Sequence, residues 1–417
     1  MKKMLILGHP IGTLDIVKYA KSLGVYTIVT DWYETNPAKE EADEALQIST
    51  ADIEALANVV KEKNIDAVFG GISDFNMGTA IEVCERTGLP FYATKEQYEV
   101  TTDKRLFKQL CQKHDLPVIE EYQLDESFKQ EDLAKIDYPV FVKPVDSAAS
   151  KGTTICFNEE DLKKAFQYAL GFSPRKQVIV EKYIENMADV NAYFTVQDGN
   201  LSLAAIRDKV LTFEQGRQYP PLPIAYIFPS AHLKKFREKC YPKIREMCKA
   251  IEIKNGRFDF SGFTDGENFV FYEMNYRLGG TQEWLFTEKV NGINVMKMMV
   301  NYALFGKMAD SDSTKLNNPD FKYPCCELKF PVKPGVVGKI EGLTEIEEIP
   351  EVIKVHLRRK IGDKIELDGS YLQMMLGVHL CAGNKMALKK AIEKINSLLK
   401  INSTDGLDMR MTPFFYE

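Results

Sequence analysis

The stretch GRFDFSGFTDGENFVFYEMNYRLGG, residues 256–280, decides the fold that this sequence predicts. Apolar residues gather on both sides of Asp265-Gly266, a dipeptide typical of tight turns, and this pattern predicts a β-hairpin. Its strands are expected near Arg257–Phe263 and Phe269–Asn275. With the turn centred on Gly266, Asp259 lies opposite Glu273, with Cβ atoms roughly 5 Å apart. Two facing carboxylates repel each other, and a divalent cation between them would remove the repulsion.

One face of the predicted hairpin carries the groups of a cation site. Because side chains alternate along a strand, Asn275 and Arg277 share the face of Glu273. Two carboxylates and an amide oxygen suit Mg²⁺ (or Mn²⁺) bridging nucleotide phosphates, and the guanidinium suits a phosphate clamp beside it. The alternative is an ordinary hairpin with charges on its solvated face. The apolar opposite face and the Arg-Leu-Gly-Gly that follows favour the metal site.

Length and composition exclude several classes of protein. The chain has 417 residues, enough for two to four domains. Its net charge is −6 and it has no basic block, so nucleic acid is not an expected partner. The first apolar run ends at Leu7-Gly8, too short for a signal peptide, and no apolar stretch is long enough to span a membrane. The eight scattered cysteines predict free thiols in a cytoplasmic protein.

Residues 1–100 predict a parallel α/β layer, because short apolar strands alternate with amphipathic helices. The expected strands are Met4–Gly8, Tyr26–Thr30 and Ala67–Gly70, with the first helix near Leu14–Leu23. Asp31 invites a dinucleotide interpretation, but His9-Pro10-Ile11-Gly12 is not a G-x-G-x-x-G motif, so no dehydrogenase is predicted. The segment Gly70–Asp74 could contact substrate or only cap the next helix.

Residues 101–305 begin with a helix and a β-rich module. Small residues at Pro144–Gly152 let backbone amides approach phosphate oxygens, and Lys151 adds a mobile charge. A linker is the alternative, but the position after Lys143, at the end of a buried strand, favours a lid over phosphates. The elements expected here are a helix near Thr102–His114, strands at Tyr138–Lys143, Thr153–Phe157, Gln177–Tyr183 and Asp189–Val196, and a helix at Glu159–Leu170 that ends at Gly171.

A loop-rich stretch at Leu211–Phe228 and one helix at Ser230–Ile251 are expected before the hairpin, and a helix near Val295–Leu304 after it. Arg207, on a strand leading toward the hairpin, could bind a substrate carboxylate or lie on the surface, and the residues leave both interpretations open. The polar stretch Lys307–Tyr323 predicts a domain boundary before a small α+β domain. That domain is expected to contain strands near Cys326–Phe330, Val352–Leu357 and Tyr371–Leu376 and a helix at Asn384–Leu399.

Taken in order, these motifs resemble those of the ATP-grasp superfamily, from about residue 1 to 305. They are Asp103-Lys104, Tyr138-Pro139-x-Phe141-Val142-Lys143-Pro144, the small-residue loop, Val180-Glu181-Lys182-Tyr183-Ile184, Phe258-Asp259-Phe260 and Glu273-x-Asn275-x-Arg277-Leu278-Gly279-Gly280. The chain looks most like the carboxylate–amine ligases, and is similar also to biotin carboxylase and the carbamoyl-phosphate synthetase large subunit. No A-M-K-M sequence is present, so a carboxylase with its own biotin domain is excluded.

The resemblance implies a mixed α/β and α+β protein with the ATP-grasp fold. Its expected parts are a Rossmann-like parallel α/β domain at 1–100, an ATP-grasp domain at 101–305 with a lid subdomain at about 116–184 and a central antiparallel sheet, and a small C-terminal α+β domain at 324–417. That last domain more loosely resembles the accessory domain of amino-acid ligases.

The resemblance also implies a role for each motif residue in binding ATP. Lys104 and Lys143 would contact phosphates, under a lid that includes Ser147, Ser150, Lys151 and Gly152. Glu181 would meet the adenine amino group, with Lys182, Tyr183 and Ile184 along the ring edge, and Asp189 would take the ribose hydroxyls. Asp259 and Glu273 would hold one Mg²⁺, and Glu273 and Asn275 a second. Arg277 would clamp the transferred phosphate, and with Lys143 and Arg207 it completes the set of candidate catalytic residues.

The predicted activity is therefore an ADP-forming ligation. A carboxylate attacks the γ-phosphate of MgATP to give an acyl phosphate, and an amine then displaces phosphate to form an amide. The partners are a small carboxylate and a small amine, with amino acids among the candidates. Two alternatives stay open, namely a bicarbonate-dependent carboxylase or carbamoyl-phosphate-type enzyme, and an ATP-binding protein without catalysis. The substrates cannot be read from the sequence, and a homodimer is expected only by analogy.

Overall fold

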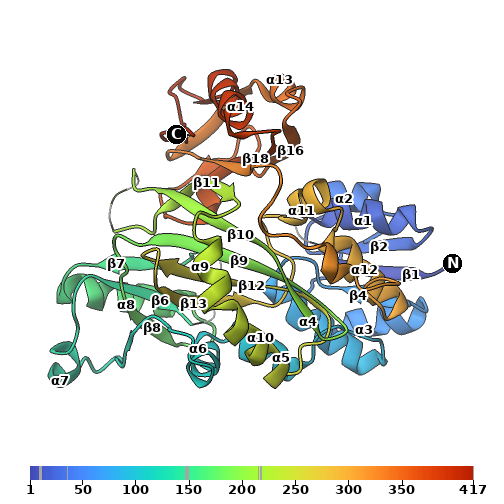
Figure 1. The fold of residues 1–417 in the computed structure, drawn as a ribbon, viewed down its shortest axis with the longest axis horizontal. Helices are drawn as coiled ribbons and strands as arrows, with labels where there is room; N and C mark the ends of the chain where they lie inside the picture. Colours follow the sequence, from blue (N-terminus) through green and yellow to red (C-terminus); the bar gives the residue numbers. More distant parts are fainter. Residues whose placement is uncertain (9–11, 35, 146–149, 215, 217, 417) are drawn as a thin grey trace.

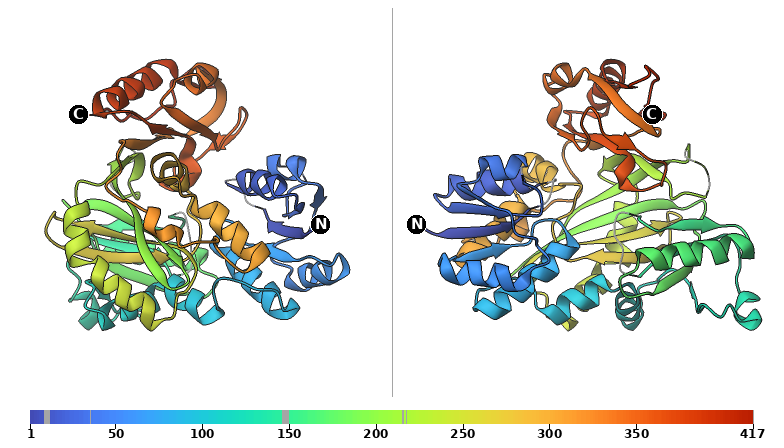
Figure 2. Two further views of the ribbon diagram at one scale, coloured as in Figure 1. Left: turned by 45° about the vertical axis from the view of Figure 1, so that its right-hand side comes forward. Right: turned by 180° about the vertical axis from the view of Figure 1, so that it is seen from behind.

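The computed structural model describes residues 1–8, 12–34, 36–145, 150–214, 216 and 218–416. Three smaller parts surround one long sheet (Figure 1, Figure 2). In Figure 1 the N-terminal layer lies on the right, a small sheet between residues 121 and 182 lies at the lower left, and the C-terminal segment lies at the top. In the described part of the chain, none of the helices is both long and apolar enough to cross a membrane.

The N-terminal layer is the predicted parallel α/β arrangement. Its sheet has the order β3-β2-β1-β4, and every pairing in it is parallel. The strands are β1 (Lys3–Leu7), β2 (Tyr26–Thr30), β3 (Glu44–Leu46) and β4 (Ala67–Phe69), and the helices are α1 (Thr13–Ser22), α2 (Pro37–Glu41), α3 (Ile53–Glu62) and α4 (Asp74–Thr87). The short strand β3 was not predicted, because it is an edge strand without an apolar run.

A four-stranded antiparallel sheet, in the order β5-β8-β6-β7, follows two short helices. The helices are α5 (Lys95–Thr102), which was not predicted, and α6 (Lys104–Lys113), which confirms the helix predicted near Thr102–His114. The side chain of Asp103 caps α6 at the amides of Arg105 and Leu106. The strands are β5 (Glu121–Tyr122), β6 (Val140–Pro144), β7 (Thr154–Cys156) and β8 (Val178–Lys182), with helices α7 (Gln130–Leu133) and α8 (Glu159–Phe172). The predicted end of α8 at Gly171 is wrong, since the helix continues through that residue.

The central sheet has eight antiparallel strands in the order β13-β12-β9-β10-β11-β14-β18-β16. Its strands are β9 (Ala188–Gln197), β10 (Asn200–Thr212), β11 (Leu222–Phe228), β12 (Gly256–Thr264), β13 (Phe269–Asn275), β14 (Cys325–Pro331), β16 (Val352–Leu357) and β18 (Met374–Cys381). The predicted loop at 211–228 is wrong at its end, where the apolar run Leu222–Phe228 forms β11 despite Pro223.

The C-terminal segment adds its longest strands to this sheet. Strands β14, β18 and β16 extend it beyond β11, so the sheet continues from the hairpin into the C-terminal part. A second, three-stranded sheet and two helices pack with them around a core that includes Ile346, Val378 and Leu388. These elements are β15 (Gly335–Glu341), β17 (Lys364–Ile365), β19 (Lys400–Ser403), α13 (Leu343–Glu347) and α14 (Lys385–Leu398). All eight cysteines are free thiols, as predicted.

One face of the central sheet is aromatic and buried. The rings of Phe194 and Phe258 stack with centroids 4.8 Å apart, and Phe260 meets Phe271 edge-on at 5.4 Å. Four more helices belong to this part of the chain: α9 (Leu233–Lys239), α10 (Tyr241–Ala250), α11 (Trp284–Asn291) and α12 (Val295–Phe305). The single helix predicted for 230–251 is two helices, because Pro242 in the first turn of α10 lacks the amide that a continuous helix needs.

The register of the hairpin differs from the prediction by two residues. Asp259 faces Asn275, and Ser261 faces Glu273, so the predicted pairing of Asp259 with Glu273 is wrong. The loop has four residues between Thr264 and Phe269, and the register shifts again at Gly262. Only glycine fits at this position, because a Cβ at residue 262 would lie 2.6 Å from the Val270 carbonyl oxygen. The shift of two residues keeps Glu273 and Asn275 on their predicted face, whereas the irregularity at Gly262 places Phe271 on the opposite face, in the aromatic core.

We expect the substitution Gly262→Ala to lower the free energy of unfolding by about 2 kcal/mol, because the added methyl group must displace the backbone of β13. Urea unfolding followed by circular dichroism measures the difference. Gly78→Ala is the control, because Gly78 lies inside α4 with open space around it, and alanine there should be neutral or stabilising. Equal stability of the two variants would contradict the role of Gly262.

Candidate functional site

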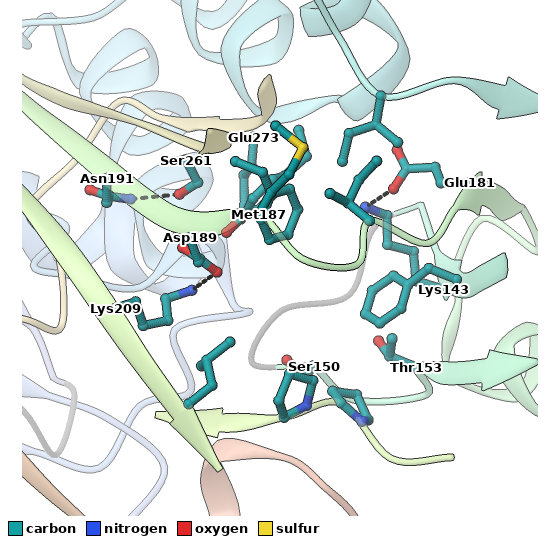
Figure 3. A pocket seen from close by; sticks show the side chains of 18 of the residues that line it. Lys143, Ser150, Thr153, Glu181, Met187, Asp189, Asn191, Lys209, Ser261 and Glu273 are labelled. Carbon is teal, nitrogen blue, oxygen red and sulfur yellow. Dashed lines mark hydrogen bonds and ion pairs between the residues drawn. The ribbon is translucent and has the colours of Figure 1, made fainter. Parts of the chain in front are cut away.

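A cavity of about 700 Å³ lies between the polar face of the central sheet and the β5-β8-β6-β7 sheet (Figure 3). Its lining brings together thirteen of the predicted site residues: Lys104, Lys143, Ser150, Glu181, Lys182, Tyr183, Ile184, Asp189, Arg207, Asp259, Glu273, Asn275 and Arg277. Lys151 and Gly152 do not line it. Gly152 instead packs against Phe172, which a Cβ would approach to 2.8 Å. Ser147 lies outside the described residues.

The register of three strands aligns the polar groups in a row. Glu273 on β13 faces Ser261 on β12, which faces Asn191 on β9. The amide nitrogen of Asn191 donates to the hydroxyl of Ser261 at 2.6 Å and to Asp259 Oδ2 at 3.2 Å (Figure 3 shows the first bond). The amide nitrogen of Asn275 donates to the same Oδ2 at 3.3 Å. Two neutral amides therefore hold one oxygen of Asp259 on the sheet.

The oxygen atoms of Asp259, Glu273 and Asn275 fit a cation that takes most of its ligands from a bound phosphate group and from water. Glu273 is partly exposed to the cavity, and no described residue hydrogen-bonds its carboxylate. Within the described ranges, no three His, Cys, Asp or Glu side chains gather as a metal site. Two carboxylates and one amide form an incomplete oxygen shell, of the kind that Mg²⁺ completes with phosphate oxygens and water.

Arg257 is a buried residue of the site that the sequence analysis missed. Its Nε donates to Glu283 Oε1 at 2.7 Å, and its Nη1 bonds Asp259 and the Arg277 carbonyl oxygen. Burial raises the pKa of Glu283, and Arg257 opposes that shift. The alternation of side chains along the strand could have identified it. Arg257 stands two residues before Asp259 and therefore shares its face, while Phe258 and Phe260 lie on the other face.

Arg277 connects the hairpin to the N-terminal layer. Its Nε and Nη2 bond the two carboxylate oxygens of Asp74 at 2.5 and 2.6 Å. Burial would raise the pKa of Asp74, but the Arg277 guanidinium lowers it overall. Of the predicted segment Gly70–Asp74, Ser73 caps α4 and Asp74 holds this arginine. The clamp assigned to Arg277 stays a prediction, and in this structure its guanidinium already has protein partners.

Two further carboxylates at the cavity wall, Glu181 and Asp189, form ion pairs with lysines (Figure 3). Glu181, 1 % exposed, lies between Lys108 and Lys143, each at 2.5 Å. Burial would raise the pKa of Glu181, but these two lysines lower it. Asp189 pairs with Lys209 at 2.6 Å. Lys104 donates to the Val145 carbonyl oxygen at 3.3 Å.

The backbone of the predicted adenine segment is partly engaged in sheet bonds. The amide of Lys182 donates to the Glu120 carbonyl oxygen, and that of Tyr183 to the Pro139 carbonyl oxygen, each at 3.0 Å. The side chain of Lys182 pairs with Asp137 on the surface. Ile184, the next residue in the chain, lines the cavity.

Residues 103–310 match the family model described as the carbamoyl-phosphate synthase L chain, ATP binding domain. This region is an ATP-grasp domain. The predicted resemblance and fold class are thereby confirmed. The match covers the small sheet, the aromatic and polar faces of the hairpin, and helices α6 to α12.

Curated relatives match either part of the chain or nearly all of it. The formate-dependent phosphoribosylglycinamide formyltransferase of Methanocaldococcus jannaschii is 28 % identical over 188 residues, which are 44 % of this chain and 48 % of the relative. The enzyme of the same description from Sulfurisphaera tokodaii is 24 % identical over 414 residues, 96 % of this chain and 97 % of the relative. The chain thus spans about half the length of the first relative and nearly all of the second.

Solved structures share the whole arrangement. The L-amino acid ligase from Bacillus licheniformis has a TM-score of 0.76 at 17 % identity, covering 97 % of this chain and 99 % of its own. The biotin carboxylase domain of Hydrogenobacter thermophilus 2-oxoglutarate carboxylase, solved with MgADP, ADP and bicarbonate, has a TM-score of 0.74 at 18 % identity, covering 98 % and 91 %. At these identities the likeness shows the fold alone.

We expect Asp74→Ala to lower the free energy of unfolding by about 2 kcal/mol at pH 7, because Arg277 loses its carboxylate partner. Since the pKa of Asp74 is lowered in the folded protein, its contribution is complete above the ordinary carboxyl pKa of about 4 and is lost as the pH falls through the lowered value. Urea unfolding between pH 7 and pH 3 measures the change. Asp310→Ala removes an exposed pair with Lys307 and should leave the free energy of unfolding nearly unchanged. A pH-independent difference would contradict this account.

Proposed function

We propose that the chain is an ATP-dependent, ADP-forming carboxylate–amine ligase. The observation that carries the proposal is the polar face of the central sheet, where Asp259, Glu273 and Asn275 line the same cavity as Lys104 and Lys143. An oxygen-ligand cation site beside buried lysines suits the triphosphate of a nucleotide. The names of the relatives, which include formyltransferases and an L-amino acid ligase, agree with this class of reaction.

ATP would lie along the cavity between the two sheets. Lys104 and Lys143 would bind phosphates, and Ser150, which lines the same cavity, would lie beside them. Glu181 would meet the adenine, with Lys182, Tyr183 and Ile184 along its edge, and Asp189 would take the ribose. Because Lys143 pairs with Glu181 in this structure, we expect it to exchange that carboxylate for a phosphate oxygen.

Asp259, Glu273 and Asn275 would hold Mg²⁺, whose chemical contribution when bound is to neutralise and align the phosphates. The residues around them keep these ligands in place. Arg257 bonds one oxygen of Asp259, and two amides bond the other, so the carboxylate has a fixed orientation. Residues that hydrogen-bond a metal ligand commonly fix its orientation in this way.

The reaction would proceed in two displacements. An oxygen of the acid's carboxylate attacks the γ-phosphorus, the bond to the ADP oxygen breaks, and an acyl phosphate forms. The nitrogen of an amine then attacks the acyl carbon, phosphate leaves with the electron pair of the C–O bond, and the nitrogen loses a proton. Arg277 and Arg207 are the proposed guanidinium contacts for the transferred phosphate and for the acid. The small sheet over the cavity would keep water from the acyl phosphate.

The test is ADP release by the purified protein with MgATP and a panel of acids and amines. The panel contains formate, single and paired amino acids and short dicarboxylic acids, each with and without bicarbonate. ADP release that requires an acid and an amine supports the ligase. Release that follows bicarbonate alone would replace it with a carboxylase, and binding of ATP without turnover on any acceptor would replace it with a binding protein.

We expect Glu273→Gln to lower the rate of ADP release by about 100-fold and to raise the Mg²⁺ concentration needed for half-maximal rate, because one of two cation-facing carboxylates is lost. A coupled ADP assay with a Mg²⁺ titration measures both quantities. Glu267→Gln, in the exposed turn of the same hairpin, is the matched control and should leave both unchanged. An unaltered Mg²⁺ dependence in Glu273→Gln would contradict the proposed cation site.

A further inference from the structure

Arg207 is a buried cation with which no carboxylate of the described residues forms an ion pair. Its side chain is 5 % exposed. Its Nε donates to the Tyr193 hydroxyl, and its guanidinium lies over the Tyr226 ring with Cζ 3.5 Å from the centroid. Its Nη1 is buried without a hydrogen-bond partner. A buried guanidinium in this state is costly unless an anion joins it.

Arg257 offers a second such nitrogen to the same cavity. The residue is 1 % exposed, and its Nη2 is buried without a hydrogen-bond partner. Glycine at position 279 leaves space beside this nitrogen, because a Cβ there would lie 2.9 Å from it. Since Nη1 of the same guanidinium bonds Asp259, the free Nη2 lies beside the proposed cation site.

Tyr193 separates the two guanidinium groups. The centre of its ring lies 5.0 Å from Cζ of Arg257 and 5.9 Å from Cζ of Arg207, and all three residues line the cavity. Tyr193 stands on β9, between β12, which carries Arg257, and β10, which carries Arg207. The two unpartnered nitrogens therefore belong to strands roughly 10 Å apart, one at the cation site and one further along the sheet.

We propose that the acid substrate is a compact dicarboxylate, whose reacting carboxylate binds Arg257 beside the cation site and whose second carboxylate binds Arg207. This inference rests on the proposed function. A monocarboxylic acid would leave Arg207 buried and unpaired in the complex. A site built for a charged group discriminates strongly against an analogue that lacks it, because the group's protein partner then stays unsatisfied. Tyr371, which lines the cavity and bonds the Tyr226 hydroxyl at 2.5 Å, stands at the Arg207 end.

The experiment compares pairs of acids that differ only in the second carboxylate. ADP release is measured for succinate against succinamate, glutarate against glutaramate, aspartate against asparagine and glutamate against glutamine, at saturating MgATP with ammonium as the amine. We expect kcat/KM for the best dicarboxylate to exceed that of its half-amide by at least about 30-fold. We expect Arg207→Met to abolish this preference and Arg207→Lys to restore part of it. Arg245→Met, an exposed arginine on α10, is the control.

The outcomes separate the subsite from the proposed function. Equal kcat/KM for the half-amides in the wild-type protein, or an Arg207→Met effect confined to the KM for ATP, would overturn the dicarboxylate subsite and leave the ligase standing. If no acid supports ADP release, the proposed ligase fails. Calorimetric binding of the same acid pairs in the presence of MgADP then decides the subsite, and equal affinities would overturn it.

Discussion

The candidate site depends on the alternation of side chains across four paired strands, β13, β12, β9 and β10. On one face, Phe194, Phe258, Phe260 and Phe271 form the aromatic core. On the other, the residues between and opposite them are the acids, amides and arginines of the cavity. Because each strand contributes to both faces, the burial that stabilises the sheet also orients the polar groups. A shift of one residue in any pairing would exchange the two faces, and the aromatic core opposes that exchange.

Charged contacts then join the outer parts of the chain to this sheet. Asp74 of the N-terminal layer holds Arg277 at the end of β13. Lys354 of β16, at the opposite edge of the sheet, bonds Asp15 of α1 at 2.5 Å. The N-terminal layer therefore contacts both edges of the central sheet. Glu181 and Lys143 lie on the small sheet across the cavity, and Lys108 joins them from helix α6. The cavity lies between the small sheet and the central sheet, with Tyr371 of the C-terminal segment in its wall, and such boundaries are where small-molecule sites commonly form.

The sequence was sufficient for the features that depend on pattern and insufficient for those that depend on spacing in three dimensions. Alternation and turn chemistry located β12, β13 and the face that holds Asp259, Glu273 and Asn275. The residue that faces Asp259 was predicted wrongly, because the prediction assumed symmetric pairing about Gly266. That assumption includes neither the observed loop length nor the register shift at Gly262. Lys108 and Arg257 were missed, because each acts on a predicted residue through a contact that no motif contains. The extension of the sheet by β14, β18 and β16 depends on pairings between segments far apart in the chain.

The charges left unbalanced in the cavity have opposite signs at separate places. Among the described residues, Glu273 faces the cavity without a cation partner, while Arg207 is buried without an anion partner. Arg257 is an intermediate case. Two carboxylates pair with its guanidinium, but its Nη2 has no hydrogen-bond partner. A single small anion cannot satisfy all three. A cation with nucleotide phosphates at Glu273, together with an acid that reaches Arg207, can satisfy each of them, because each ligand then supplies the charge that the fold withholds at that position. The unpaired groups of the protein therefore describe the ligands as a complementary set, which is the reason to treat the cavity as one site for two substrates.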